Sequence, residues 1–171
     1  MDSYNKKLAT KGAAGEKALN KWLKKQKLPY VPIGQSQDSF SSLFPGAVKR
    51  PDFFLLLQSL GMIAIDAKNY KYSGGVFTLN LELELRKMIA FERLFRIPVW
   101  FAYMGEDSNE WYWISGLQAI EVGEVRENSK TKESFIAIKK SQCAKISSAN
   151  DLGLLFSQTL PSSNKIAKTM G

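Results

Sequence analysis

The chain has 171 residues, a length that fits one domain with a single sizeable core. It has no histidine and one cysteine, Cys143, which excludes Ser-His-Asp and Cys-His triads, histidine-based zinc sites and internal disulfides. Any catalysis must therefore use carboxylates, lysine, tyrosine or serine, with a hard metal ion held by oxygen ligands. The net charge of +8 favours a polyanionic partner, either nucleic acid or an acidic membrane surface.

Several features predict where the protein resides. The longest apolar runs, at residues 53–57 and 62–65, have the length of strands and are too short to span a bilayer. The first residues (MDSYNKK) show no apolar stretch behind their positive charges, unlike a signal peptide. With a single cysteine, these features indicate a cytoplasmic (intracellular) protein in a reducing compartment, with no membrane partner.

The first predicted element is a helix over residues 10–27. Ala14, Ala18 and Trp22 recur at every fourth position, and lysines fill the other face. Pro29 ends this helix and leads into a short extended piece, which a polar loop over residues 34–46 follows.

Two short apolar segments then predict a tight β-hairpin. Residues 52–58 (DFFLLLQ) and 62–68 (MIAIDAK) are joined by a short turn at Ser59, Leu60 and Gly61. Nearly every residue of both segments is apolar, which is typical of central strands that helices cover on both faces.

The remaining elements complete an α/β sandwich around a mixed sheet. They are a brief strand at 76–79, a second helix at 81–96, buried strands at 98–103 and 110–114, an edge strand at 134–138, and a short helix at 150–158 that Asn150 caps. The second helix carries its apolar stripe on Leu85, Met88, Ile89, Leu94 and Phe95 with Phe91 at its edge. We expect a single domain over residues 1–160 and a polar C-terminal tail over 161–171.

Three ionisable residues stand at the ends of the predicted hairpin. Asp66 and Lys68 project to the same face of their strand because they are two residues apart, and Asp52 begins the partner strand. Two nearby carboxylates repel each other unless a cation is present, and a divalent ion can also bind a phosphate oxygen and activate water. The alternative is a salt bridge between Asp66 and Lys68 at a strand end. The Pro-Asp start and the hairpin spacing favour the functional interpretation.

At these positions the sequence resembles the PD-(D/E)XK nuclease superfamily. The resemblance rests on Pro51-Asp52 and Asp66-Ala67-Lys68, and it covers about residues 10–120. It implies a restriction-endonuclease-like αβββαβ core, in which Asp52 and Asp66 bind Mg²⁺, or Mn²⁺ in its place, and Lys68 assists the attacking water. The Ala67 carbonyl could supply a further metal ligand.

The resemblance extends to the first predicted helix. Residues 11–16 (KGAAGE) resemble the archaeal Holliday-junction-resolvase-like branch, where a glutamate at the position of Glu16 completes the metal site. A solvated glutamate near a helix N-terminus is the alternative. Gly12 and Gly15 either let backbone or phosphate come close or simply loosen the start of the helix.

Candidate nucleic-acid contacts surround this centre. They are Lys11, Lys71, Tyr72, Arg86 and Lys87. For Arg86 or Lys87 taken alone, a solvated helix face shared with Glu82 and Glu84 is the better interpretation. The tryptophans are more typical of core packing than of base stacking.

Together these features predict a Mg²⁺-dependent endonuclease that hydrolyses phosphodiester bonds in DNA, including branched or structured DNA. A homodimer would suit cleavage of two strands or of a symmetric junction. One alternative is a non-catalytic nucleic-acid-binding module with the same fold. Another is a basic membrane-surface or protein-interaction domain, whose first helix would lie on its partner.

Overall fold

The computed structural model describes residues 3–35, 46–69, 75–107 and 109–157, with side chains from residue 12 onward. Its main feature is a six-stranded sheet in the order β1-β2-β3-β5-β6-β9. The strands are β1 (Tyr30–Pro32), β2 (Phe53–Leu57), β3 (Gly61–Lys68), β5 (Val99–Met104), β6 (Trp111–Ser115) and β9 (Ala144–Ile146). The β3–β5 pair is parallel and the other pairs are antiparallel, so the predicted mixed sheet is confirmed.

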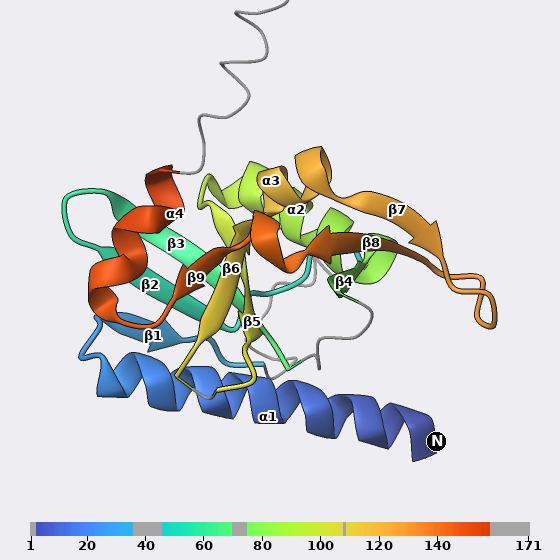
Figure 1. Ribbon diagram of the computed structural model, residues 1–171, viewed down its shortest axis with the longest axis horizontal. Coiled ribbons are helices and arrows are strands. Elements are labelled where there is room, and N and C mark those ends of the chain that lie inside the picture. The colour runs from blue at the N-terminus through green and yellow to red at the C-terminus, as the bar shows by residue number, and fades with distance from the viewer. Residues whose placement is uncertain (1–2, 36–45, 70–74, 108, 158–171) are drawn as a thin grey trace, which may run out of the picture.

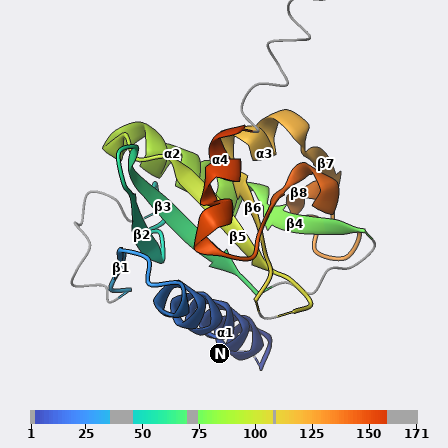
Figure 2. The ribbon, with the colours of Figure 1, turned by 60° about the vertical axis from the view of Figure 1, so that its left-hand side comes forward.

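Helices cover both faces of this sheet (Figures 1 and 2). They are α1 (Ser3–Lys25), α2 (Arg86–Phe95), α3 (Gly116–Val122) and α4 (Leu154–Ser157). One face packs against α1 and α4, and the other against α2, α3 and a small second sheet. The second sheet has the order β4-β8-β7, with β4 at Val76–Asn80, β8 at Ser134–Lys139 and β7 at Glu124–Glu127.

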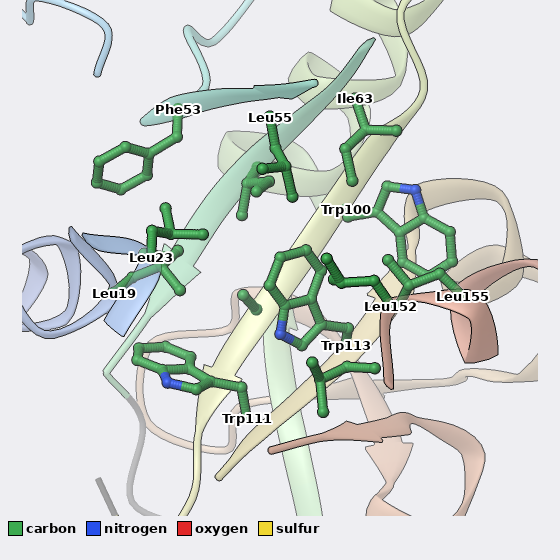
Figure 3. Packing of buried hydrophobic residues seen from close by; sticks show 14 of the residues in the cluster. Leu19, Leu23, Phe53, Leu55, Ile63, Trp100, Trp111, Trp113, Leu152 and Leu155 are labelled. Carbon is green, nitrogen blue, oxygen red and sulfur yellow. The ribbon is translucent and has the colours of Figure 1, made fainter. Parts of the chain in front are cut away.

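The tryptophans of the chain lie in the first core, between α1 and the sheet. Trp22, Trp100, Trp111 and Trp113 are all buried there, among leucines of α1 and the C-terminal turns (Figure 3). Their burial confirms the core interpretation over base stacking. Leu19, Trp22 and Leu23 of α1 are likewise buried against the sheet, so these side chains are not available to a membrane or a partner. Ala14, which the predicted stripe included, is exposed. None of the described helices is both long and apolar enough to cross a bilayer.

The β2–β3 hairpin has the predicted position and register. Phe53 pairs with Ile65, and Leu57 pairs with Gly61. Two residues at the turn have a positive φ angle, Ser59 (66°) and Gly61 (121°). Glycine adopts such a backbone conformation without steric cost because it has no Cβ atom. The hairpin register therefore fixes the positions of Asp52 and Asp66, which lie next to Phe53 and Ile65.

The second predicted helix differs from the structure at both ends. Residues Leu81–Leu85 form a π-helical turn before α2 begins, and Arg96 ends α2 in the left-handed conformation. Leu94 and Phe95, in the last turn of α2, are exposed instead of lying on the buried stripe. Only Leu85, Met88 and Phe91 are fully buried in these two segments.

Three further expectations need correction or extension. The strand predicted at 134–138 is central in the second sheet, not at an edge, because β7 pairs with its outer side. The last helix is preceded by a 3₁₀ turn at Ala149–Gly153, where Ser148 and Asp151 provide the cap instead of Asn150. The elements α3, β7 and β9 were not predicted, and the proposed tail at 161–171 lies outside the described residues.

Candidate active site

The hairpin register places Asp52 and Asp66 opposite each other. Because Phe53 pairs with Ile65, the next step along the two strands brings Asp52 level with Asp66. The Asp52 amide donates to the Ile65 carbonyl at 2.8 Å, and the Ala67 amide donates to Asp52 Oδ2 at 2.7 Å. Backbone bonds thus hold the Asp52 carboxylate across the end of β3.

Asp66 and Lys68 form the buried part of the site. Lys68 Nζ lies 2.6 Å from Asp66 Oδ2, although that oxygen has no hydrogen bond of good geometry. The two residues are only 1% and 4% exposed, and the ion pair between them confirms that they share a face of β3. An ion pair at this depth has little help from solvent and depends on its neighbours for compensation.

Two residues that the sequence analysis did not place here complete the charge cluster. Lys49, which precedes β2 by a few residues, has its Nζ 2.7 Å from Asp66 Oδ1. Glu84, which was expected on a solvated helix face, forms an ion pair with Lys68 and lies 3.8 Å from Lys49 Nζ. The cluster therefore alternates acids and lysines, with Asp66 and Glu84 each between two ammonium groups.

The π turn before α2 explains why Glu84 points inward. Asn80 caps this turn by accepting a hydrogen bond from the Leu83 amide at 2.8 Å. Glu84 Oε2 reaches back and accepts from the Asn80 amide at 3.0 Å, so the two side chains satisfy the start of the helix reciprocally. The other oxygen of Glu84 is then free to meet Lys68. Glu82, two residues earlier, is instead exposed and pairs with Arg86 at 3.0 Å.

Burial and neighbouring charges shift the pKa values of the two aspartates in opposite directions. Burial, the Asp66 carboxylate and Glu16 raise the pKa of Asp52 to about 7, against the opposing effects of the Ala67 amide and Lys49. Burial would also raise the pKa of Asp66, but the ammonium groups of Lys68 and Lys49 outweigh it and hold that pKa below its usual value. Burial opposes the charge on Lys68, yet Asp66 and Glu84 raise its pKa well above the ordinary lysine value.

These side chains surround a pocket of about 450 Å³. Its lining residues are Gly12, Glu16, Gln35, Lys49, Asp52, Asp66, Ala67, Lys68, Asn69 and Glu84. One pocket thus brings together the predicted site residues Asp52, Asp66, Ala67, Lys68 and Glu16. Glu16 belongs to α1, and the other four belong to the β2–β3 hairpin or its ends.

Gly15 explains how α1 approaches this pocket so closely. A Cβ atom at Gly15 would lie 2.9 Å from both the backbone nitrogen and the Cβ of Asn69, whereas a Cβ at Gly12 would meet nothing within 4 Å. The close-approach interpretation therefore holds for Gly15 and not for Gly12.

The donor set suits a hard divalent cation. Asp52, Asp66 and Glu16 offer carboxylate oxygens at the pocket. Among the described residues, no three Asp, Glu or Cys side chains are arranged closely enough to hold an ion by themselves. The ammonium groups of Lys49 and Lys68 occupy the cationic positions around Asp66 in this conformation. A metal would fit the chemistry of the donors, but only with a shift of these lysines or with further oxygen ligands from substrate or water.

The expected nucleic-acid contacts are not drawn into the pocket. Arg86 is exposed and engaged with Glu82, and Lys87 is half-buried with its carbonyl accepting from the Lys49 amide at 3.4 Å. Lys71 and Tyr72 lie outside the described residues, as does the side chain of Lys11.

Comparisons with known proteins add little to this geometry. No family model matches the sequence, and no curated protein matches it. Among solved structures, the chain is similar to D212, a nuclease from a fusselovirus, with 14% identity, a TM-score of 0.41 and 88% of each chain covered. A similarity at this level neither places the chain in a family nor carries the activity of D212 over to it.

Proposed function

We propose that this chain is a metal-dependent endonuclease that hydrolyses phosphodiester bonds in nucleic acid, with DNA as the substrate. The observation that carries the proposal is the buried cluster of Asp52, Asp66 and Lys68 at the base of an open pocket. Burying charges costs free energy, and the raised pKa of Asp52 means that its charged form is disfavoured where it stands. Strongly perturbed carboxylates cluster at functional sites, so their convergence in this pocket supports a catalytic role.

The proposed Mg²⁺ ligands are Asp52, Asp66, the Ala67 carbonyl and Glu16. Bound there, Mg²⁺ would polarise a phosphoryl oxygen and lower the pKa of a bound water. Mn²⁺ offers the same preference for oxygen ligands and would substitute.

The lysines have different proposed roles because they differ in exposure. Lys68 is buried and its pKa is raised, so at neutral pH it is an ammonium without a lone pair. It therefore orients the attacking water and stabilises charge on the phosphoryl group, but does not act as a base. The side chain of Lys49 is 34% exposed at the pocket, where it can donate to a non-bridging phosphate oxygen. Glu84 is a positioning residue that holds Lys68.

A binding module is the second candidate, and one observation favours it. Asp66 already has an ammonium group near each of its two oxygens, so the cluster is compensated without a metal. A protein that binds nucleic acid without cutting it could retain such a closed network. In that case the pocket would be structural and its replacement by neutral residues would leave nucleic-acid binding intact.

Cleavage assays separate the two functions. Purified protein is incubated with Mg²⁺ or Mn²⁺ and with linear, nicked, branched and single-stranded DNA, and with RNA. We expect cleavage of DNA by the wild type, and none by Asp66→Ala or Lys68→Ala variants that circular dichroism shows to be folded. Glu82→Ala removes an exposed carboxylate two residues from Glu84 and should keep full activity. A wild type that binds these substrates but cuts none of them contradicts the endonuclease and supports the binding module.

A further inference from the structure

A second pocket, of about 560 Å³, is rich in lysine. Its lining residues are Gly75, Tyr112, Lys139, Lys140, Ser141, Cys143 and Lys145, and we call it the lysine pocket. It draws on the end of β8, the turn that follows it, β9 and β6. None of its three lysines lines the pocket around Asp52 and Asp66, and none was among the nucleic-acid contacts predicted from the sequence.

The charges around the lysine pocket leave an excess of positive charge. Lys140 Nζ lies 4.4 Å from the centre of the Tyr112 ring, a cation–π contact that holds the ammonium at the pocket. Lys145 pairs with Glu110 at 2.5 Å, and Lys139 is exposed. Glu124, which interacts with Lys139, is already paired with Arg126 at 2.6 Å.

Cys143, the buried thiol that lines the lysine pocket, does not offset this positive charge. Burial raises the pKa of the Cys143 thiol to about 12, so the sulfur stays neutral at physiological pH. Glu110 offsets Lys145, and a bound anion would offset the positive charge that remains around the pocket.

The sheet connects this pocket to Lys68 by a single cross-strand row. Lys68 pairs with Tyr103, Tyr103 pairs with Tyr112, and Tyr112 pairs with Lys145. Directly paired residues project to the same face of a sheet, and neighbouring strands are about 4.8 Å apart. Three strand steps therefore separate the Lys145 backbone from that of Lys68 by about 14 Å.

That separation is short enough for one DNA molecule to reach both pockets. A duplex advances about 3.4 Å for each phosphate of one strand, so about 14 Å corresponds to roughly four steps. We propose that the lysine pocket binds up to three backbone phosphates, about one for each of its lysines, of the same DNA molecule whose scissile phosphate lies at Asp52, Asp66 and Lys68. The inference rests on the proposed function and names a second contact that sets the orientation of the substrate relative to the two pockets.

The test measures DNA binding without cleavage. A fluorescent DNA duplex is titrated in EDTA at several salt concentrations, and the slope of log affinity against log salt is determined by anisotropy. The variant Lys139→Gln/Lys140→Gln/Lys145→Gln should lower the magnitude of this slope by about 2 to 3, since each phosphate contact contributes about 0.9. The matched control Lys24→Gln/Lys130→Gln/Lys132→Gln removes the same charge from exposed positions that line neither pocket, and it should change the slope by less than about 1.

Two further variants distinguish the loss of a phosphate contact from misfolding of the protein. Replacing the same three lysines by arginine keeps the charge and should restore the wild-type slope. Lys139→Gln alone changes an exposed side chain and should lower the slope by about 1. Equal losses in the pocket variant and the matched control would overturn the inference.

The outcomes also separate this inference from the endonuclease. A wild type that binds no DNA overturns the lysine-pocket inference. A wild type that binds through the lysine pocket but never cuts overturns only the endonuclease. A wild type that cuts, with a slope that does not depend on the pocket lysines, leaves the endonuclease standing and removes the second contact.

Discussion

Asp52 and Asp66 stand opposite each other across the β2–β3 hairpin, yet their surroundings drive their pKa values in opposite directions. Two ammonium groups contact Asp66, whereas Asp52 has one backbone amide and a neighbouring negative charge. At neutral pH one carboxylate is therefore firmly ionised and the other is close to its titration point. Pairs of titratable groups whose pKa values are pushed apart are characteristic of sites that carry acid–base or metal chemistry.

The first prediction concerns stability and pH in Asp52→Asn. The pKa of Asp52 is about 7 in the folded protein and 3.8 ordinarily, so ionisation favours the unfolded chain. This penalty is absent below pH 3.8, develops as the pH rises to about 7, and is constant above that. The substituted amide carries no charge, and its oxygen can still accept from the Ala67 amide. We expect the variant to be more stable than wild type by on the order of 3 kcal/mol at pH 8 and to match it near pH 4. Urea unfolding at the two pH values measures this, and an equal difference at both would rule out ionisation of Asp52 as the cause.

The second prediction concerns metal binding. A cation at the two aspartates requires Asp52 to lose its proton, so below pH 7 the affinity should fall by up to about tenfold for each pH unit. Calorimetric titration with Mn²⁺ at pH 5.5, 6.5 and 8 measures the dependence. Asp52→Asn should bind weakly and with little dependence on pH in this range. Affinity of the wild type that is constant from pH 5.5 to 8 would contradict a role for Asp52 as a ligand.

The third prediction compares the two lysines at Asp66. Lys68→Met leaves Glu84 and Asp66 with one lysine between them, and we expect a loss of about 3 kcal/mol in the free energy of unfolding. Lys49→Met removes a partly exposed partner and should cost about 1 kcal/mol or less. Cleavage should be lost in Lys68→Met, as in Lys68→Ala, and should fall about tenfold in Lys49→Met. Full cleavage by a folded Lys68→Met variant would remove Lys68 from the mechanism.

How much of this site was visible in the sequence depends on how local each relationship is. Asp52, Asp66 and Lys68 follow from the alternation of a strand and the register of a short hairpin, both of which are local. Lys49 and Glu84 reach Asp66 only after a loop and a helix start have packed against the sheet. A lysine and a glutamate in polar segments carry no periodic signal that distinguishes them from surface residues.

The fold shows the same division. Buried strands with apolar runs were predicted, but only β2 and β3 with their pairing. The first helix was predicted from residue 10, whereas α1 begins at Ser3. The π turn at Leu81–Leu85 was not, because a stripe at 3.6-residue spacing assumes one continuous α-helix. That assumption placed Glu84 on the solvated face. The charged strand β7 and the three-residue strand β9 owe their place to pairing with a neighbour and not to their own composition.

The fourth prediction uses two glycines of α1 as a matched pair. Gly15→Ala brings a Cβ within 2.9 Å of the Asn69 backbone, which cannot move without shifting the end of β3. We expect it to destabilise the protein by about 1 to 3 kcal/mol and to reduce cleavage. Gly12→Ala meets nothing within 4 Å and should stabilise the helix by about 0.5 to 1 kcal/mol. Thermal unfolding of the two variants checks the opposite signs, and similar shifts in both would show that α1 does not press on Asn69.

The fifth prediction concerns Glu84→Gln. The amide keeps the acceptor for the Asn80 backbone but removes one of the two carboxylates that raise the pKa of Lys68. Lys68 is then held less firmly, so kcat should fall about tenfold while KM changes little. Glu82→Gln, on the exposed side of the same turn, is the control and should leave both constants unchanged. A rise in KM with constant kcat would instead assign Glu84 to substrate binding.

Within the described part of the chain, the six-stranded sheet ends on both sides in strands of only three residues, β1 and β9, and β1 closes with Pro32. Short edges and a residue without an amide hydrogen offer few hydrogen bonds to an incoming strand. The smaller sheet ends on one side in β7, whose exposed residues include Glu124, Arg126 and Glu127. Two copies of this chain would gain little by joining their sheets edge to edge, so a homodimer is better served by contacts between helices. Short edges of this kind also protect a newly made chain against sticking to its neighbours through strand addition.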